Sequence, residues 1–451
     1  MTRSSDAEAR TLSFLNDLVA QAIKAGANSA DAIAAESVSL GVSQRLGKRE
    51  DLERSEAVDL GLRVMLGKRQ SMVSSTDRSD AAVDELVARA VAMAKIAPED
   101  PHIGLADPDL IAKTWPELDL LDPYEPETEE LYARTAQAED AARAVAGITN
   151  SEGADAGWGR STVALVTSGG FGAAYSGTSH SVSASVIAGE GTGMERDYDY
   201  SSVRFVKDLE DAAAIGRQAG ERAVKRLNPR KVKSGPAPVI FGPRVSNGLL
   251  GHLAGSINGA AVARGTSFLR DKMDEKIFAD GIVIVDDPHR KTGLASRPFD
   301  GEGVANRRMN LVEDGRLMTW LLDTATGHQL GMKSTGHASR GASSPPSPNR
   351  SNLYMEPGTQ TPDALMADIT SGLYVTELIG FGVNAVTGDY SRGAAGFWIE
   401  NGKIAFPVSE LTIAGNLKDM FLNATPANDL EFRYGTNAPT IRLEGLTVAG
   451  A

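Results

Sequence analysis

Residues 39–49, SLGVSQRLGKR, and residues 57–69, AVDLGLRVMLGKR, indicate how the first half of the chain folds. Each run largely alternates apolar residues with polar or small ones, as half-buried strands do. Both runs end in the same tetrapeptide, Leu-Gly-Lys-Arg, at 46–49 and at 66–69. Glycine followed by a polar residue favours a tight hairpin turn, because glycine adopts positive φ at little cost. The two runs therefore predict a twisted antiparallel meander.

Helical patterns surround this meander. Residues 7–25 place apolar residues at helical spacing, and Gly26 follows them as a C-cap. Residues 150–207 are rich in Ser, Thr, Gly, Val and Ala with short alternations, which predicts further strands. We therefore expect an N-terminal α+β domain, in which a twisted antiparallel sheet is covered by helices at 80–97, 126–147 and 208–227.

A domain boundary is predicted near the middle of the chain. The stretch PRKVKSGPAP, residues 229–238, is basic, rich in proline and without apolar periodicity, as linkers are. A chain of 451 residues exceeds what one hydrophobic core usually supports, so two domains are expected. We place the first over residues 1–230 and the second over residues 236–451.

The second half consists mostly of predicted strands and loops. Residues 239–241 and 282–285 are short apolar runs, typical of buried strands. Two segments, LVEDGRL at 311–317 and WIENGKI at 398–404, place Asp-Gly or Asn-Gly between apolar strands, which is the strongest short-range signal for a type I′ hairpin. Few helices longer than two turns are expected. The whole chain is thus predicted to be α+β, with a strand-rich, barrel-like C-terminal domain.

Composition excludes several classes of function. The formal net charge of −13 argues against binding of nucleic acid as the main activity, because phosphate binding needs clustered Lys and Arg. The chain has no cysteine, so it has no disulfide and no thiolate ligand, and a cytoplasmic location fits this. No window reaches about 18 consecutive apolar residues, and the N-terminus does not resemble a signal peptide. We therefore expect no membrane association.

One helix of the second half resembles a metalloprotease helix without its metal ligands. It includes GLLGHLAGSINGA, residues 248–260, and carries one apolar stripe from a start near Pro243. Its remaining surface is rich in glycine, each costing about 1 kcal/mol against alanine in an exposed helix, so we expect another surface to approach closely. A zinc site of this kind needs two histidines about one turn apart, a glutamate and a third ligand. His252 stands alone.

Six stretches together resemble the TldD/PmbA family, on its PmbA branch, which is also called TldE. Each stretch is weak by itself, but their order and spacing make the resemblance specific, and it extends over nearly the whole chain. They are IVDDP at 284–288, FDGEG at 299–303, LVEDG at 311–315, GMKSTG at 331–336, GDYSRG at 388–393 and GFWIENG at 396–402.

The TldD branch of that family is a metalloprotease with a His-Glu-x-x-x-His helix and a distant cysteine ligand. By this resemblance the first histidine falls on Gly251, the glutamate on His252 and the second histidine on Ser256. Every metal-site position is therefore substituted, and the chain has no cysteine to serve as the third ligand. The resemblance implies a non-catalytic partner, with zinc expected only in a TldD-type catalytic subunit that acts on unfolded proteins or peptides.

Each of these features also has a simpler interpretation. His252 is more typical of a packed or hydrogen-bonded residue than of a ligand or base. Four acidic side chains could hold a hard cation, and they are Asp286, Asp287, Asp300 and Glu302. Such groups more often cap turns or pair with arginines such as Arg307 and Arg308. Six residues are candidates for a peptide groove or a subunit interface, and they are Gly255, Gly259, Asp389, Tyr390, Ser391 and Arg392. For the last four of these, a purely structural turn is the alternative.

Two functions from different classes remain open on the sequence. The first is a regulatory or substrate-binding subunit without chemistry of its own, which pairs with a TldD-type subunit and forms a homodimer in isolation. The second is a self-sufficient metal-dependent peptidase with an unrecognised site, built on His252 or on the acidic cluster. Modulation of DNA gyrase is a third reading that rests on a family label alone. Metal content and chelator sensitivity of the pure chain distinguish the first two.

Overall fold

The computed structural model describes residues 3–450. The two runs at 39–49 and 57–69 lie in neighbouring strands of one antiparallel six-stranded sheet, with the order β3-β2-β1-β4-β5-β6. The β1–β2 turn places Leu46 and Gly47 at φ of 51° and 74°, which confirms the predicted tight hairpin. The strands are β1 (Ser29–Arg45), β2 (Lys48–Leu66), β3 (Arg69–Ser75), β4 (Ile148–Thr167), β5 (Gly172–Ala188) and β6 (Glu195–Val203).

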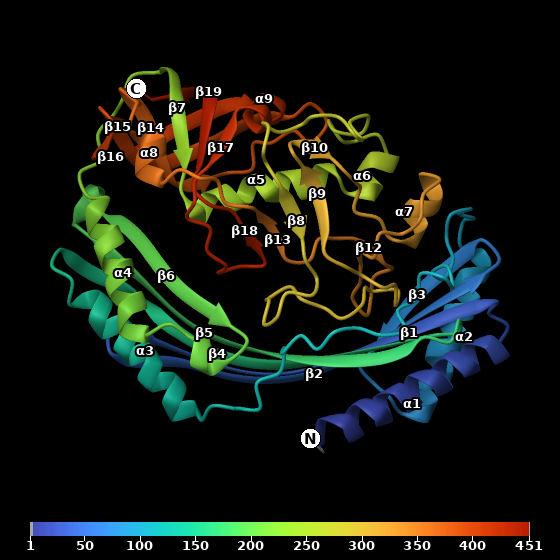
Figure 1. Ribbon diagram of the computed structural model, residues 1–451. Helices are drawn as coiled ribbons and strands as arrows, with labels where there is room; N and C mark the ends of the chain where they lie inside the picture. The colour runs from blue at the N-terminus through green and yellow to red at the C-terminus, as the bar shows by residue number, and fades with distance from the viewer. Residues whose placement is uncertain (1–2, 451) are drawn as a thin grey trace.

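Four helices pack on the outer, convex face of this curved sheet, two at each end (Figure 1). They are α1 (Arg3–Lys24), α2 (Asp80–Ile96), α3 (Thr128–Arg143) and α4 (Ala212–Lys225). Each predicted helix is present, but α4 begins four residues later than expected. The reason is its cap, because the Asp211 side chain accepts a hydrogen bond from the Ala214 N–H at 2.8 Å.

The second half contains a closed five-stranded barrel. Its strands follow the order β16-β15-β14-β7-β19, and pairing of β16 with β19 closes the ring. They are β7 (Gly235–Phe241), β14 (Ser371–Ile379), β15 (Asp389–Glu400), β16 (Lys403–Asn416) and β19 (Ile441–Ala449), with β17 (Ala424–Pro426) added beside β19. The predicted barrel-like domain is confirmed.

The predicted linker is shorter than expected, because Gly235 to Pro238 belong to β7. Proline is tolerated there because β14 pairs with β7 only over residues 239–241, so Pro236 faces β19 alone, and Pro238 lies where the register with β19 shifts. Both predicted Asp-Gly and Asn-Gly hairpins are present, with positive φ at residues 314–315 and 401–402.

A small sheet with the order β10-β9-β8-β13-β18 lies beside the barrel. Its strands are β8 (Ile284–Asp286), β9 (Met309–Glu313), β10 (Arg316–Leu317), β13 (Leu353–Met355) and β18 (Thr436–Asn437), while β11 (Ala338–Ser339) pairs with β12 (Ser347–Pro348). Among the described residues of this half, only helix α5 (Pro243–Ser256) is longer than two turns, as predicted. The short helices are α6 (Gly259–Ala263), α7 (Thr324–Gln329), α8 (Pro362–Met366) and α9 (Leu417–Leu422).

The second half rests in the concave face of the large sheet (Figure 1). The contact is tight at Gly61 of β2, where an added Cβ would lie 2.1 Å from the carbonyl oxygen of Ala342. Phe299 also packs edge-on against Phe171 and Tyr175 of the first half. None of the helices described is both long enough and apolar enough to cross a lipid bilayer.

Candidate functional site

Helix α5 carries four of the predicted site residues, Gly251, His252, Gly255 and Ser256. It begins directly after β7, with Gly242 as N-cap and Pro243 in the first turn, where the missing N–H of proline leaves no hydrogen bond unmade. The apolar stripe of the helix is buried in the largest core, between the barrel and the small sheet, through Val245, Leu249, Leu250 and Leu253. This burial fixes which face of α5 points away from the core.

The opposite face of α5 is open. A Cβ atom added to Gly248, Gly251 or Gly255 would meet no atom within 4 Å outside its own turn of helix. No contact within residues 3–450 therefore requires glycine at these positions, although each glycine lowers helix stability by about 1 kcal/mol relative to alanine. We call these three positions the glycine face.

The glycine face ends before Gly259. That residue is buried in α6, and a Cβ there would lie 2.5 Å from Leu322 Cδ2 and 2.8 Å from Thr326 Oγ1. Gly259 is therefore required for packing within the chain, and it offers no surface to a peptide or a partner.

His252 lies beside the glycine face and contacts the barrel. Its ring meets that of Tyr390 edge-on, with centroids 5.9 Å apart and an interplanar angle of 82°. Burial, together with the positive charge of Arg392, holds the pKa of His252 below its ordinary value, so the ring is neutral at pH 7. The fold thus brings together His252 from α5 with Tyr390 and Arg392 from β15.

The remaining metal-site positions supply no ligand. Gly251 has no side chain, and the hydroxyl of Ser256 donates a hydrogen bond to the carbonyl oxygen of His252 at 2.9 Å. Across the described part of the chain, no group of three or more His, Asp or Glu side chains is arranged to hold a metal ion. The donor set of α5 therefore does not fit zinc, which needs at least three protein ligands.

The 388–393 segment is the start of strand β15 rather than a turn, and hydrogen bonds to neighbouring segments hold its polar groups. The carboxylate of Asp389 accepts hydrogen bonds from Thr387 Oγ1 at 2.6 Å and Asn416 Nδ2 at 3.0 Å. The Ser391 N–H donates to the carbonyl oxygen of Gly382 at 2.6 Å, which holds the loop before β15. That loop exposes the ring of Phe381, which is 98% accessible.

The acidic residues considered as cation ligands are engaged in other contacts. Asp286 accepts hydrogen bonds from the Ser351 N–H at 2.7 Å and faces His337 Nε2 at 3.3 Å. Asp287 caps the turn at His289, whose N–H lies 3.0 Å away. Asp300 accepts from three backbone N–H groups, those of Glu302, Val304 and Ala338.

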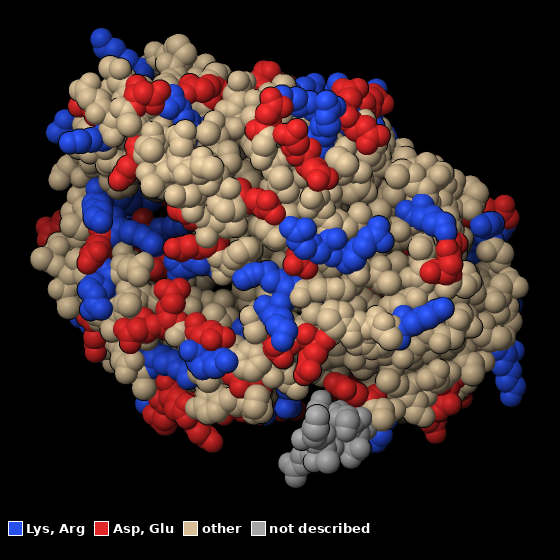
Figure 2. Space-filling model, in the orientation of Figure 1, with Lys and Arg blue, Asp and Glu red and all other residues tan. Residues whose placement is uncertain are grey.

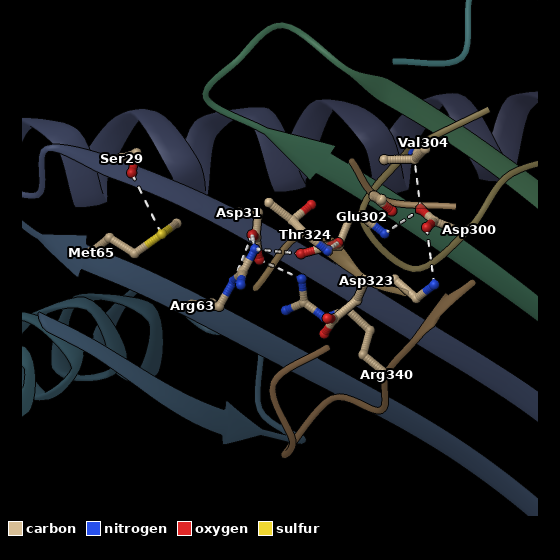
Figure 3. A network of polar contacts seen from close by, with 12 residues as sticks. Ser29, Asp31, Arg63, Met65, Asp300, Glu302, Val304, Asp323, Thr324 and Arg340 are labelled. Carbon is tan, nitrogen blue, oxygen red and sulfur yellow. Dashed lines mark hydrogen bonds and ion pairs between the residues drawn. The ribbon is translucent and has the colours of Figure 1, made fainter. Parts of the chain in front are cut away.

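Glu302 instead belongs to a buried ionic network between the two halves (Figure 3). Asp31 of β1 accepts from Arg63 Nε at 2.8 Å and from Arg340, and Arg63 Nη2 lies 3.9 Å from Glu302 Oε1. The nearest arginine to Glu302 is therefore Arg63 rather than Arg307 or Arg308, and Arg308 pairs with Glu356 at 3.2 Å. All four side chains of the network are at most 5% exposed.

Charge balance in this network is incomplete. The side chain of Asp323, which caps α7 through Thr326, adds a further carboxylate beside Glu302. Burial opposes ionisation of Asp31, but Arg63 and Arg340 outweigh it and hold its pKa below the usual value. Burial raises the pKa of Glu302 to about 7, and the negative charges of Asp300 and Asp323 act in the same direction. The positive charge of Arg63 offsets this rise only in part. Burial raises the pKa of Asp300 as well, so the proton held near neutrality belongs to the Glu302–Asp300 pair.

Three family models match the chain. They are PmbA/TldA metallopeptidase domain 1 over residues 30–94, the central domain over 121–227 and the C-terminal domain over 234–450. The metalloprotease PmbA of Escherichia coli O157:H7 is 39% identical over 423 residues, which cover 93% of this chain and 92% of that protein.

Two solved structures share the fold over nearly their full length. A proposed modulator of DNA gyrase from Bacteroides thetaiotaomicron has a TM-score of 0.90 at 28% identity, and the match covers 97% of this chain and 98% of that one. TldE from Thermococcus kodakarensis has a TM-score of 0.86 at 21% identity, covering 97% and 100%, and this likeness concerns the fold alone.

Proposed function

Because this chain belongs to the PmbA/TldD family, we propose that it is the non-catalytic subunit of a two-component metalloprotease that acts on unfolded proteins or peptides. The observation that carries the proposal is helix α5, where Gly251, His252 and Ser256 occupy the positions expected of metal ligands and base. A neutral, half-buried His252 against Tyr390 is a packing residue in this proposal. Zinc would be held by a TldD-type partner, and this chain would bind substrate or regulate that partner.

The glycine face is the surface proposed to meet the partner. Three helical glycines in open space allow another backbone to approach α5 closely. Nearby, the end of β14 presents Ile379 at 57% exposure and the following loop presents Phe381 at 98%, and exposed large apolar side chains are typical of interfaces. In isolation the same surface would support a homodimer. The cysteine-free composition supports placing the complex in the cytoplasm.

A reconstitution experiment tests the proposal. Cleavage of an unfolded polypeptide is measured with this chain alone, with a TldD-type subunit alone and with the mixture, each with and without a chelator. We expect cleavage by the mixture only, and we expect chelation to abolish it, because the metal ligands come from the partner. Chelator-sensitive cleavage by the pure chain would instead establish the self-sufficient peptidase.

Substitution of Gly255 tests the proposed interface. Gly255→Leu should weaken association with the TldD-type subunit by at least tenfold, because a leucine side chain would separate the two backbones. The isolated chain should keep its stability, since a Cβ atom at this position meets no atom within 4 Å outside its own turn of helix. Association is measured by analytical ultracentrifugation or calorimetry of the mixture.

Ala88→Leu is the matched control. Ala88 is an exposed residue of α2, a helix on the convex face of the large sheet and away from α5. It should leave association unchanged. Equal association of the Gly255→Leu and Ala88→Leu variants would remove the glycine face from the interface without touching the assignment of α5 as non-catalytic.

A further inference from the structure

A pocket lies between the two halves, on the side of the molecule away from the buried ionic network. It has a volume of about 270 Å³ and is bounded by α4 and β6 of the first half and by the start of α5, β14, β15 and residues 431–438 of the second. Figure 2 shows the hollow at the left of the view, between α4 and the barrel, with Lys and Arg side chains gathered in it.

One side of this pocket is apolar and rigid. Tyr374 of β14, Phe397 of β15 and Tyr434 supply aromatic surface, and Ala438 lies between them and the start of α5. Gly242 permits this arrangement, because a Cβ there would lie 2.9 Å from Tyr374 Oη. Tyr434 is held in place by Tyr200 of β6, whose ring centroid is 5.6 Å away.

The other side of the pocket is cationic. Five basic side chains line it against two acidic ones, and they are Arg222, Lys225, Arg226, Arg244 and Arg433 against Asp197 and Glu431. Carboxylates that do not line the pocket fix three of the guanidinium groups. Arg222 pairs with Asp199 at 2.9 Å, Arg226 with Glu377 at 2.6 Å and Arg433 with Glu210 at 2.9 Å.

This arrangement holds the guanidinium groups in place before any ligand arrives. The guanidinium group of Arg244 pairs with Asp197 at 2.8 Å and lies over the ring of Tyr198, so two contacts hold it in position. Lys225 is at the exposed rim, and no carboxylate of residues 3–450 forms an ion pair with it. Among the side chains that line the cavity, five are basic and two are acidic, beside an aromatic wall; the carboxylates behind them offset part of this positive charge.

We infer that this pocket binds the carboxylate of a ligand that also carries one aromatic or aliphatic group. A guanidinium group binds carboxylate through two parallel hydrogen bonds, and the aromatic wall takes up the apolar group. The volume lies just below the usual range for ligand pockets, about 300–1,000 Å³, so it suits one residue-sized group. Such a group is either a free acylated amino acid or the last residue of a peptide.

Calorimetric titration of the isolated full chain tests the inference with four probes. They are N-acetyl-phenylalanine, its amide, a pentapeptide ending in phenylalanine and the same peptide with a terminal amide. Each acid should bind at least tenfold more tightly than its amide, because the amide lacks the charge. Tighter binding of the peptide acid than of N-acetyl-phenylalanine identifies a peptide end as the source, and equal binding identifies a free acid. Equal affinity for acids and amides overturns the inference.

Two variants locate the binding. Arg244→Gln should weaken binding of the better acid at least tenfold. Arg442→Gln should not, although Arg442 is also a partly buried arginine, paired with Asp368 at 2.5 Å and Glu444 at 2.7 Å outside the pocket. Lys225→Ala, at an exposed position, should weaken binding about threefold, and it decides the matter if Arg244→Gln does not fold. Unchanged binding in the folded variants overturns the inference. No partner subunit is used, so this result is independent of the proposed function.

Discussion

Replacing Asp31 with alanine should lower the free energy of unfolding by about 3–5 kcal/mol, the cost of leaving a buried charge without its partner. Asp31 is 1% exposed and accepts hydrogen bonds from both Arg63 and Arg340. Without it, two guanidinium groups remain buried between the large sheet and the second half, with Glu302 at 3.9 Å from Arg63 as the nearest remaining carboxylate. Urea unfolding of the full chain measures the change.

Asp109→Ala is the control, because it removes an exposed carboxylate that also pairs across the two halves, with Lys333. This variant should leave the unfolding midpoint where it is, since exposed ion pairs contribute little. Adding Arg340→Met to Asp31→Ala should recover part of the loss, because one of the unpaired charges is then gone. A loss in Asp31→Ala no larger than in the control would show that the network does not hold the halves together.

Glu302→Gln should remove a pH dependence of stability that the natural chain shows between pH 5 and pH 8. The pKa of Glu302 is raised to about 7 in the folded chain, against an ordinary value of 4.5. The folded state therefore holds a proton that the unfolded chain releases. This stabilisation is fully present below about pH 4.5, is lost as the pH rises through 7, and amounts to about 2–3 kcal/mol between pH 8 and pH 5.

The measurement is the difference in free energy of unfolding between the natural chain and Glu302→Gln at several pH values. The glutamine keeps the hydrogen bond that the Thr324 N–H donates at 2.8 Å, so the variant mimics the protonated form. Glu313→Gln, on an exposed position of β9, serves as control and should follow the natural chain. A difference that stays constant from pH 5 to pH 8 would place the proton on another group.

Local signals predict the elements of this fold well. The hairpins at 314–315 and 401–402 follow from short sequences, because Asp-Gly and Asn-Gly between apolar strands favour positive φ at both positions. The buried stripe of α5 follows equally from spacing. The start of α4 and the length of the linker do not, because Asp211 and the partners of β7 decide them through contacts that the pattern does not contain.

The candidate site is predictable only where its residues share one element. Gly251, His252 and Ser256 are fixed relative to one another by α5, but the contact of His252 with Tyr390 needs the packing of α5 on β15. The ionic network was missed because Asp31 and Arg340 are 309 positions apart. One signal was present, since Asp31 and Arg63 are single charges inside otherwise apolar strand segments, where a charge requires a buried partner.

The closure of the barrel sets the order in which the two halves can be completed during synthesis on the ribosome. Every strand of the large sheet has been made by Val203, so that sheet can form while translation continues. Strand β7 is made soon afterwards, but one of its two neighbours, β19, begins only at Ile441. Until then the nascent barrel has open edges that can pair with other chains. Translation of the second half is therefore the interval in which a chaperone would protect this protein most.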